Sequence, residues 1–384
     1  MSLNEDRVPT KDYARQNAAL WSELAPALER VFRGDEPILG AAVTAFETAF
    51  AARHGADLHG VGTSSGTDAA LLLYRALGLA PGDEVVTNAH TFAGVVSALC
   101  LAGLKPRLVD ARPDTGRLDP AAVEAAIGPN TRAVLVVHLH GHPEPVDRIA
   151  ALCEAHGVTL IEDCAQAHDA RLHGRPVGTF GRASIYSFHP SKNLGAFGDA
   201  GLLLTADAAL AEQVRVLRNL GKAGKYTFDR LGPNAKLDTV QAAVLSVKLP
   251  HLSEFTARRR ALAARYLEGL RGVPTLRLPV VGAGAEPVWH LFVVHTPHRD
   301  ALKRFLSERG VATGLHYPIA AHDQPALAPF VAESGPLPVA RRLAAECLTL
   351  PLSHEHTDAE IDRTIAAVRA WRPKTSASDG ESVS

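Results

Sequence analysis

A chain of 384 residues, 46% of them hydrophobic, is long enough to bury a large core and suggests two domains, or one large α/β domain with an appendage. Its 40 basic and 41 acidic residues leave a net charge of −1, which disfavours nucleic acid and anionic membranes as partners. No apolar run could span a bilayer, the first nine residues lack the apolar stretch of a signal peptide, and the four cysteines are widely spaced. We therefore expect a cytoplasmic protein with no membrane segment and no disulfide framework.

From residue 58 onward, short apolar strands alternate with helices. The predicted strands are 58–62, 84–87, 106–109, 133–137, 159–161, 184–188 and 201–205, and the predicted helices are 66–77, 91–102, 120–127 and 146–156. The strands are rich in Val, Leu and Ile without polar alternation, which is typical of a parallel sheet covered on both faces. The sequence thus predicts an α/β fold with a mostly parallel, seven-stranded sheet.

The pattern changes after residue 249. A basic helix over 256–270 leads into a Pro- and Gly-rich stretch, followed by a strand over 289–295 and helices over 300–309 and 358–371. We expect a large domain at residues 1–249 and a smaller α+β domain at 250–372. The last segment, 373–384, has almost nothing to bury and is expected to be a disordered tail.

The segment Thr63-Ser64-Ser65-Gly66-Thr67-Asp68 joins a predicted strand to a predicted helix. Small residues let the backbone approach a ligand, and the free N–H groups of a helix start carry a partial positive charge. The segment is therefore a candidate phosphate site, and an ordinary capped turn is the alternative.

Asp163 follows the buried strand 159–161, at the carboxyl edge where open α/β sheets bind ligands. A carboxylate in that place could pair with a protonated pyridine nitrogen. The alternative is an aspartate that caps a turn.

Lys192 stands 29 residues after Asp163, among aromatic, Pro and Gly residues in Ser187-Phe188-His189-Pro190-Ser191-Lys192-Asn193. Partial burial there would lower the pKa of the lysine and favour the neutral amine that attacks an aldehyde. A lone lysine is more often structural, so the order of the three clusters is what favours catalysis.

The three clusters, in this order, resemble the DegT/DnrJ family of sugar aminotransferases, which are pyridoxal 5'-phosphate (PLP) enzymes of fold type I. The similarity runs along nearly the whole chain, from Leu39-Gly40 to Trp289-His290 and Gly314-Leu315-His316-Tyr317-Pro318. The resemblance implies a PLP cofactor in a large domain with a mostly parallel sheet, and a smaller C-terminal α+β domain.

The resemblance also implies a role for each residue that matches a family motif. Lys192 and Asp163 take the catalytic positions, as the lysine that carries the cofactor and the partner of its pyridine nitrogen. Gly66, Thr67 and Ser187 match the residues that hold the cofactor phosphate.

Three further cofactor contacts follow from the resemblance. Phe92 matches an aromatic ring that stacks on the cofactor, and Gln166 matches the residue beside its ring hydroxyl. Asn234 matches an asparagine that reaches the phosphate across a subunit interface. The resemblance therefore implies a homodimer with shared active sites.

On the substrate side, the resemblance points to His189, His316 and Tyr317. It implies that glutamate donates an amino group to a nucleotide-linked keto-sugar in amino-sugar biosynthesis. The segment 193–199 is similar to that of the subgroup that aminates C3 of dTDP-linked 3-keto-6-deoxyhexoses.

Three other functions are compatible with parts of this pattern. A keto-cyclitol aminotransferase would use the same cofactor site. A PLP- or PMP-dependent sugar dehydratase is disfavoured by Lys192, because such relatives carry histidine there. A DNA-binding regulator is disfavoured by the near-neutral charge and the lack of a basic arm or helix-turn-helix.

His138, His140 and His142 alternate in sequence, as metal ligands on one face of a strand would. Gly141 and Pro143 indicate that the strand has ended there, and no cysteine or carboxylate completes an obvious site. We expect no metal.

Overall fold

The computed structural model describes residues 7–34 and 36–373, so the predicted disordered tail lies almost entirely outside the described residues. Its helices are α1 (Tyr13–Arg33), α2 (Ala41–Ala52), α3 (Gly66–Ala76), α4 (Ala93–Leu101), α5 (Pro120–Ala126), α6 (Val146–His156), α7 (Ala208–Arg218), α8 (Thr239–Lys248), α9 (Leu252–Gly269), α10 (Arg299–Ser307), α11 (Ala328–Val331), α12 (Pro338–Glu346) and α13 (Asp358–Ala370). Its strands are β1 (His59–Thr63), β2 (Glu84–Asn88), β3 (Lys105–Val109), β4 (Thr131–Val137), β5 (Thr159–Asp163), β6 (Arg171–Leu172), β7 (Arg175–Pro176), β8 (Ala183–Ser187), β9 (Gly201–Thr205), β10 (Ala285–Glu286), β11 (Phe292–His295) and β12 (Cys347–Leu350). None of the helices within the described ranges is long and apolar enough to cross a membrane.

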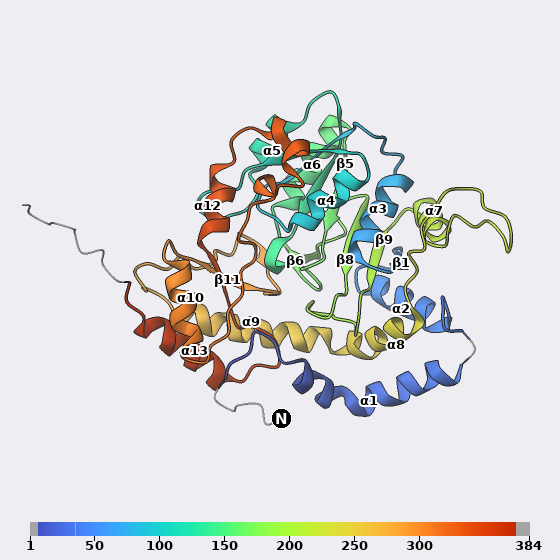
Figure 1. Cartoon of the computed structure of the whole chain (residues 1–384). Coiled ribbons are helices and arrows are strands. Elements are labelled where there is room, and N and C mark those ends of the chain that lie inside the picture. Colours follow the sequence, from blue (N-terminus) through green and yellow to red (C-terminus); the bar gives the residue numbers. More distant parts are fainter. Residues whose placement is uncertain (1–6, 35, 374–384) are drawn as a thin grey trace, which may run out of the picture.

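Seven of these strands form one sheet in the order β1-β9-β8-β5-β4-β2-β3, which confirms the predicted α/β fold (Figure 1). β9 runs antiparallel to β1 and β8, and the remaining pairs are parallel. The carboxyl ends of β1, β5 and β8 therefore meet at one edge of the sheet. Ligands bind at this edge in open α/β sheets, and the candidate site lies there.

Strand β5 supplies side chains to two cores, because successive side chains of a strand point to opposite faces of the sheet. In β5, Leu160 packs in one core and Ile161 packs in the other, together with residues of α3. By the same alternation, the side chain of Glu162 points to the same face of the sheet as Leu160, and that of Asp163 points to the same face as Ile161. A continuous apolar run is what a strand covered on both faces requires.

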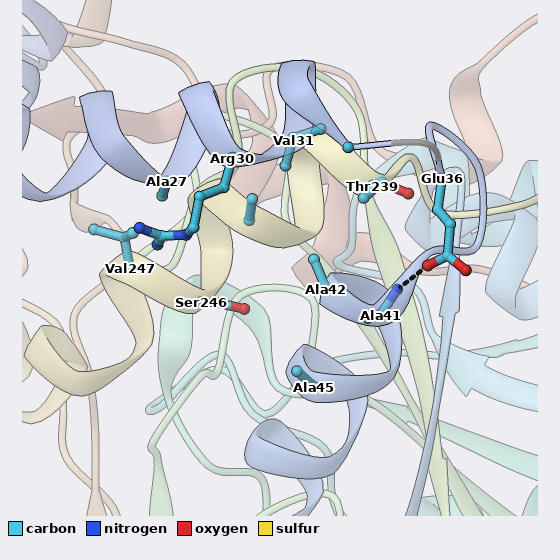
Figure 2. A pocket seen from close by; sticks show the side chains of 12 residues that line it. Ala27, Arg30, Val31, Glu36, Ala41, Ala42, Ala45, Thr239, Ser246 and Val247 are labelled. Atoms are coloured by element: carbon cyan, nitrogen blue, oxygen red, sulfur yellow. Dashed lines mark hydrogen bonds between the residues drawn. The ribbon is translucent and has the colours of Figure 1, made fainter.

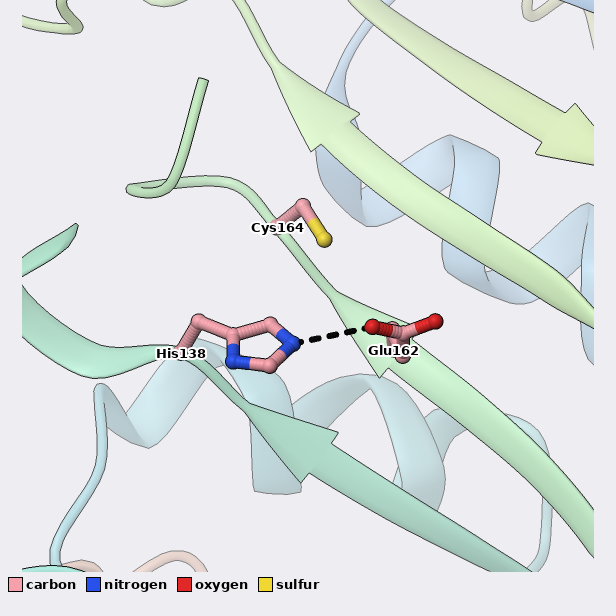
Figure 3. A group of neighbouring side chains, drawn as sticks. All are labelled: His138, Glu162 and Cys164. Atoms are coloured by element: carbon pink, nitrogen blue, oxygen red, sulfur yellow. Dashed lines mark hydrogen bonds and ion pairs between the residues drawn. The ribbon is translucent and has the colours of Figure 1, made fainter. Parts of the chain in front are cut away.

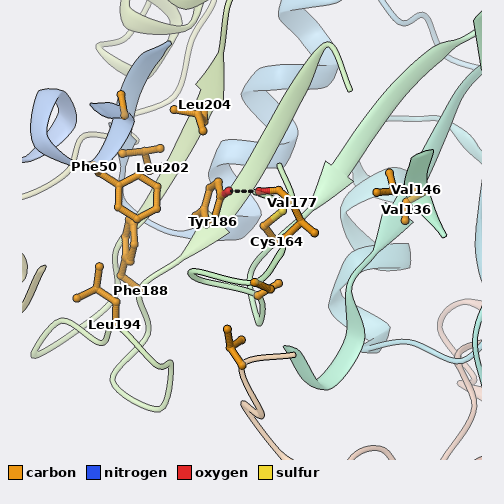
Figure 4. Close-up of a cluster of buried hydrophobic side chains, with 14 of the residues drawn as sticks. Phe50, Val136, Val146, Cys164, Val177, Tyr186, Phe188, Leu194, Leu202 and Leu204 are labelled. Carbon is orange, nitrogen blue, oxygen red and sulfur yellow. Dashed lines mark hydrogen bonds between the residues drawn. The ribbon is translucent and has the colours of Figure 1, made fainter. Parts of the chain in front are cut away.

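Aromatic rings fill the core near β8 (Figure 4). Phe50 of α2 meets Tyr186 and Phe188 edge to face, with ring centroids 4.9 and 5.2 Å apart. The Tyr186 hydroxyl donates to the backbone oxygen of Val177 at 3.2 Å. These contacts fix the end of β8, from which the chain continues to Lys192.

A separate core joins the C-terminal elements to the beginning of the described chain. β11 and β12 pair antiparallel, and their apolar side chains pack with those of α9, α10 and α13. Val8 enters this core, and its backbone N–H donates to the oxygen of Gly310 at 2.9 Å. The domain division at residue 249 stays a prediction, and residue 8 packs with elements from the far side of that division.

The predicted strand 289–295 is too long, because β11 begins only at Phe292. Trp289 has a φ of 48°, in the left-handed region, and this interrupts the extended backbone. The partner strand β12 has four residues and directly precedes Pro351, and the sequence prediction does not include it.

Candidate active site

A cavity of about 370 Å³ lies at the carboxyl edge of the sheet. Its walls come from the starts of α3 and α4, the ends of β5 and β8, the segment after β8, and residues 316–317. The predicted site residues that line it are Gly66, Thr67, Phe92, Asp163, Ser187, His189, Lys192, His316 and Tyr317. Residues far apart in the chain thus meet around one volume.

The N-terminus of α3 faces this cavity through Ser65, Gly66 and Thr67. Ser65 caps the helix, because its side-chain oxygen accepts the backbone N–H of Asp68 at 3.0 Å. A Cβ on Gly66 would lie 2.9 Å from the Cβ of Ser187, so the close approach of the end of β8 requires glycine. The free N–H groups of the first helical turn and Ser187 form a cup that suits a phosphate.

Asp163 is the last residue of β5 and is 8% exposed. Its Oδ1 accepts the backbone N–H of Ala165 at 2.9 Å. Burial raises the pKa of Asp163, while the Ala165 N–H and the charge of Lys192 act in the opposite direction. A carboxylate oxygen has further acceptor capacity, so Asp163 is able to take a hydrogen bond from a cationic ligand nitrogen.

Lys192 lines the same cavity as Asp163. Its backbone N–H donates to the oxygen of His189 at 2.8 Å, which closes a tight turn after β8. Burial lowers the pKa of Lys192 to about 8, and the charge of Asp163 partly opposes this shift. At pH 8 roughly half of such amines are neutral, which is the nucleophilic form.

Gln166 has a fixed orientation, because both ends of its amide are engaged. Its Oε1 accepts the backbone N–H of His140 at 2.6 Å, so its Nε2 is the donor end. Nε2 donates to the Tyr317 hydroxyl at 2.9 Å. An amide nitrogen has a second N–H, and the predicted role beside a ring hydroxyl requires such a donor.

Phe92 precedes α4 and lines the cavity with a side chain that is 48% exposed. The predicted helix 91–102 starts at Ala93 instead, because Phe92 has an extended backbone with a ψ of 126°. The Phe92 ring centroid lies 5.1 Å from that of Tyr317. A Cβ at Gly94 would clash with the Phe92 ring, so glycine keeps this aromatic face in place.

The two predicted substrate-side histidines have different surroundings. The Nδ1 of His316 lies 2.8 Å from the Oγ1 of Thr349, and burial lowers the pKa of His316 to about 4, which keeps the ring neutral. His189 is exposed, and its Nδ1 lies 2.9 Å from the Oγ of Ser191. Both line the cavity, and their roles toward a substrate stay predictions.

Asn234 does not line the cavity of its own chain. It is exposed, and its Oδ1 accepts a hydrogen bond from the Nζ of Lys236 at 2.5 Å. A backbone bridge to Asn219 closes the loop between these two residues. Its role at a neighbouring subunit's phosphate stays a prediction.

No sequence motif points to Tyr74 or Lys11. Tyr74 is buried and lines the cavity from α3, where Thr67, Ala70 and Tyr74 share one face at helical spacing. That spacing, counted from the predicted phosphate residue, is the signal that identifies Tyr74. The Nζ of Lys11 donates to the backbone oxygen of Ser191, a contact that spans 180 residues and has no signal in the sequence.

The alternating histidines do not share one face. The Nε2 of His140 lies 3.1 Å from the backbone oxygen of His316, and the ring of His142 packs edge to face on Trp289 at 4.4 Å. His140 has a φ of 62°, which ends the extended alternation at this point.

His138 instead joins Glu162 and Cys164 on the far face of the sheet (Figure 3). The Nδ1 of His138 accepts the backbone N–H of Glu144 at 3.0 Å, so in a neutral ring the proton lies on Nε2 and faces Glu162 at 3.1 Å. Burial raises the pKa of the Cys164 thiol well above its usual value, which disfavours the thiolate that binds metals.

The Glu162 carboxylate is saturated by backbone donors. It accepts N–H groups from Gly178 and Phe180, both at 2.7 Å, and from Gly181 at 2.8 Å. We call this group, with His138, the Glu162 network. It is a closed hydrogen-bond network that anchors the segment 178–181, and Cys164 lies beside it.

A sheet of this order, with a lysine, an aspartate and a helix N-terminus around one cavity, defines an α/β protein of PLP fold type I. The chain belongs to the DegT/DnrJ/EryC1/StrS aminotransferase family, whose sequence pattern matches residues 19–369. This family is of the PLP-dependent aminotransferase class.

Comparison with known proteins agrees with this assignment. The chain is 44% identical over 365 residues to the dTDP-3-amino-3,4,6-trideoxy-alpha-D-glucose transaminase of Streptomyces venezuelae, covering 95% of this chain and 96% of the relative. The solved structure of S. venezuelae DesV matches with a TM-score of 0.92 at 44% identity, over 95% of this chain and 98% of that chain. NtdA from Bacillus subtilis, solved with bound cofactor PMP, matches with a TM-score of 0.85 at 28% identity, over 96% of this chain and 85% of that chain.

Proposed function

We propose that this chain uses PLP to move the amino group of glutamate onto the keto group of a nucleotide-linked sugar. The observation that carries the proposal is the presence of Lys192, Asp163 and the N-terminus of α3 around one cavity. They supply a nucleophilic amine, a carboxylate and a phosphate cup. Family membership and the name of the S. venezuelae relative support the reaction class.

The residues around the cavity fit PLP. Gly66 leaves room for a phosphate at the start of α3, and Phe92 offers an aromatic face to a planar ring. Asp163 is buried and able to pair with a protonated pyridine nitrogen. When bound, PLP supplies an electron sink that acidifies the carbon bearing the amine.

The chain's own residues would then move protons and hold the reactants. The Nζ of Lys192 accepts the proton from the amine-bearing carbon of the donor and later delivers a proton to the keto carbon of the acceptor. Its pKa of about 8 suits both directions near neutral pH. Asp163 stabilises positive charge on a ring nitrogen, and the donor end of Gln166 orients a ligand oxygen.

We place the amination at C3 of a dTDP-linked 3-keto-6-deoxyhexose. The S. venezuelae relative is named for a dTDP-3-amino sugar, which supports this position. Asp199, at the end of the segment that follows Lys192, lines the cavity and could accept a hydrogen bond from a sugar hydroxyl. Because a displacement of about 1 Å can cost roughly a hundredfold in rate, the carbon held nearest the cofactor is the one that reacts.

A panel of nucleotide-linked keto-sugars and keto-cyclitols, each with glutamate, tests the proposal. We expect the dTDP-linked 3-keto-6-deoxyhexose to give an amino sugar by mass spectrometry, with the amine placed at C3 by NMR. Amination at C4, or a clear preference for a keto-cyclitol, would overturn the substrate assignment. DNA binding without bound cofactor would instead favour the regulator alternative.

We also propose a homodimer with shared active sites, in a cytoplasmic protein. Large apolar side chains are exposed near the start of α8 and on the loop that carries Asn234: Ile38 at 48%, Phe197 at 69% and Leu231 at 92%. A groove of about 750 Å³ lies between α1, α2 and α8, and its walls include Ala27, Ala42 and Ala45 as well as polar residues such as Arg30 and Ser246 (Figure 2). A second copy would remove this apolar surface from water and bring Asn234 to a neighbouring site.

Hybrid dimers test this arrangement. Lys192→Ala and Asn234→Asp subunits are each expected to be inactive alone. Mixed and re-equilibrated one to one, they should recover about a quarter of the wild-type rate, because half of the dimers are hybrids and each hybrid has one intact site. No recovery, or a fully active monomer, would contradict shared sites.

A further inference from the structure

A second cavity, of about 380 Å³, adjoins the first and shares Lys192 and His316 with it. It lies between the N-terminal segment, where Lys11 lines it, and the C-terminal elements, where Thr349 lines it. This volume suits a small organic molecule. The two cavities thus meet at the catalytic lysine from different sides.

Lys11 occupies a fixed position in this wall. The backbone oxygen of Val8 accepts the N–H of Ala312 at 2.9 Å, and Asp12 caps α1 through its side chain. Between these two anchors, the Nζ of Lys11 donates to the backbone oxygen of Ser191, the residue immediately before Lys192. The side-chain amine of Lys11 is therefore held against the peptide group that joins Ser191 to Lys192.

The surroundings of Lys11 are mainly cationic. Burial is the largest cause that lowers the pKa of Lys11, followed by the charge of Arg259, and Lys192 adds to the effect. Glu355 is the acidic group that opposes it. Arg259 is only 1% exposed and donates to the backbone oxygen of Leu352, which lines the cavity, at 3.0 Å. Such a charge distribution favours an anionic ligand.

We propose that the second cavity binds the side-chain carboxylate of a dicarboxylic amino donor, and that Lys11 is the residue that recognises it. The inference rests on the proposed aminotransferase function and specifies its donor half. A five-carbon amino dicarboxylate whose amine lies at Lys192 has a second carboxylate able to extend toward Lys11 and accept a charge-assisted hydrogen bond. A monocarboxylate donor such as alanine is too short to make this contact.

Calorimetric titration of the holoenzyme with glutarate tests the inference without any turnover, because glutarate has two carboxylates and no amine. Lys11→Gln removes the charge and keeps a donor for the Ser191 oxygen. We expect it to weaken glutarate binding by about tenfold to a hundredfold, the scale of one charged hydrogen bond. The matched control is Lys303→Gln, an exposed lysine on α10, which should leave the affinity unchanged.

The donor preference provides a second readout. In Lys11→Gln, the ratio of kcat/KM for glutamate to that for alanine should fall by a similar factor, while the rate with alanine stays within about twofold. Unchanged glutarate affinity and an unchanged donor ratio would overturn the inference. An equal loss with both donors would also overturn it, because Lys11 would then only tether the N-terminal segment.

A comparison on the wild-type holoenzyme keeps the inference testable even if Lys11→Gln does not fold. Glutarate should bind at least about tenfold more tightly than butyrate, which lacks the second carboxylate. Equal affinities would overturn the inference. Failure of the proposed function would look different, because the wild-type protein would then transfer no amino group from any donor.

Discussion

Glu162 and Asp163 are neighbours at the end of β5, but they lie on opposite faces of the sheet, in two regions with opposite character. Glu162 is completely buried and accepts three backbone N–H groups besides its contact with His138. Asp163 is also buried, at 8% exposed, but the described residues give it a single backbone donor, from Ala165, and it lines a cavity. The Glu162 network is closed, whereas the Asp163 region keeps acceptor capacity for a ligand.

The difference shows why two buried carboxylates that are adjacent in sequence have different roles, one in stability and one in ligand binding. A buried charge is tolerated only when donors satisfy it. In the Glu162 network the protein itself supplies those donors, so the carboxylate stabilises the fold. Around Asp163 a ligand has to supply some of the hydrogen-bond donors, so this carboxylate is available to bind a reactant or cofactor.

Among the substitutions around Asp163, that of Lys192 is expected to lower the rate of amino transfer most. Lys192→Ala should lower the rate of amino transfer at least about a thousandfold, because the nucleophile and the proton carrier are lost together. Initial rates with glutamate measure this. Borohydride reduction and peptide mapping of the wild-type holoenzyme should find the cofactor on Lys192, and a cofactor found on Lys11 instead would move the chemistry into the second cavity.

Asp163→Asn should retain cofactor but lose at least about a hundredfold in turnover, because a neutral amide cannot hold a protonated pyridine nitrogen. The midpoint temperature of its thermal unfolding should stay close to that of the wild type, because the substitution affects only one backbone hydrogen bond of Asp163, that from Ala165. Near-normal rates would show that Asp163 only caps a turn, and the contrast with Glu162 would then have no functional meaning.

The pH dependence of cofactor capture should show a smaller effect. Burial lowers the pKa of Lys192 to about 8, and only the neutral amine reacts, so capture of PLP by apoenzyme should accelerate as the pH rises through 8. Between pH 7 and 9 the neutral fraction rises about tenfold. Stopped-flow absorbance measures the rate. A wild-type midpoint near the unshifted lysine pKa would contradict the burial of this amine.

The variant Asp163→Asn should shift this midpoint to lower pH, because the charge of Asp163 raises the pKa of Lys192.

Glu162→Gln should leave turnover per folded molecule within about twofold, which is the smallest catalytic effect of the series. It should instead lower the free energy of unfolding by about 2–4 kcal/mol, because an amide is a weaker acceptor and turns an N–H toward backbone donors. Urea denaturation measures the stability. A variant of full stability with impaired turnover would place Glu162 in the chemistry and erase the difference between the two faces.

The sequence predicted the seven strands of the main sheet and placed Asp163 at its carboxyl edge. These predictions succeed because a strand buried on both faces needs a continuous apolar run, and such a run is a local signal. The predicted strand 289–295 is too long because the left-handed backbone of Trp289 is set by tertiary contacts.

By itself, the sequence determined what depends on neighbours in the chain: the strands of the main sheet, the cap at Ser65, and the order of the three motifs. Tertiary structure alone decided that Lys11 lies against Ser191, and that Glu162 rather than Asp163 receives the backbone donors of residues 178–181. Both outcomes depend on segments distant in sequence that pack on a particular face of β5 or beside Lys192. Residue type and spacing carry no record of such contacts, because the same carboxylate or amine satisfies its charge with whichever groups the fold brings within hydrogen-bond distance.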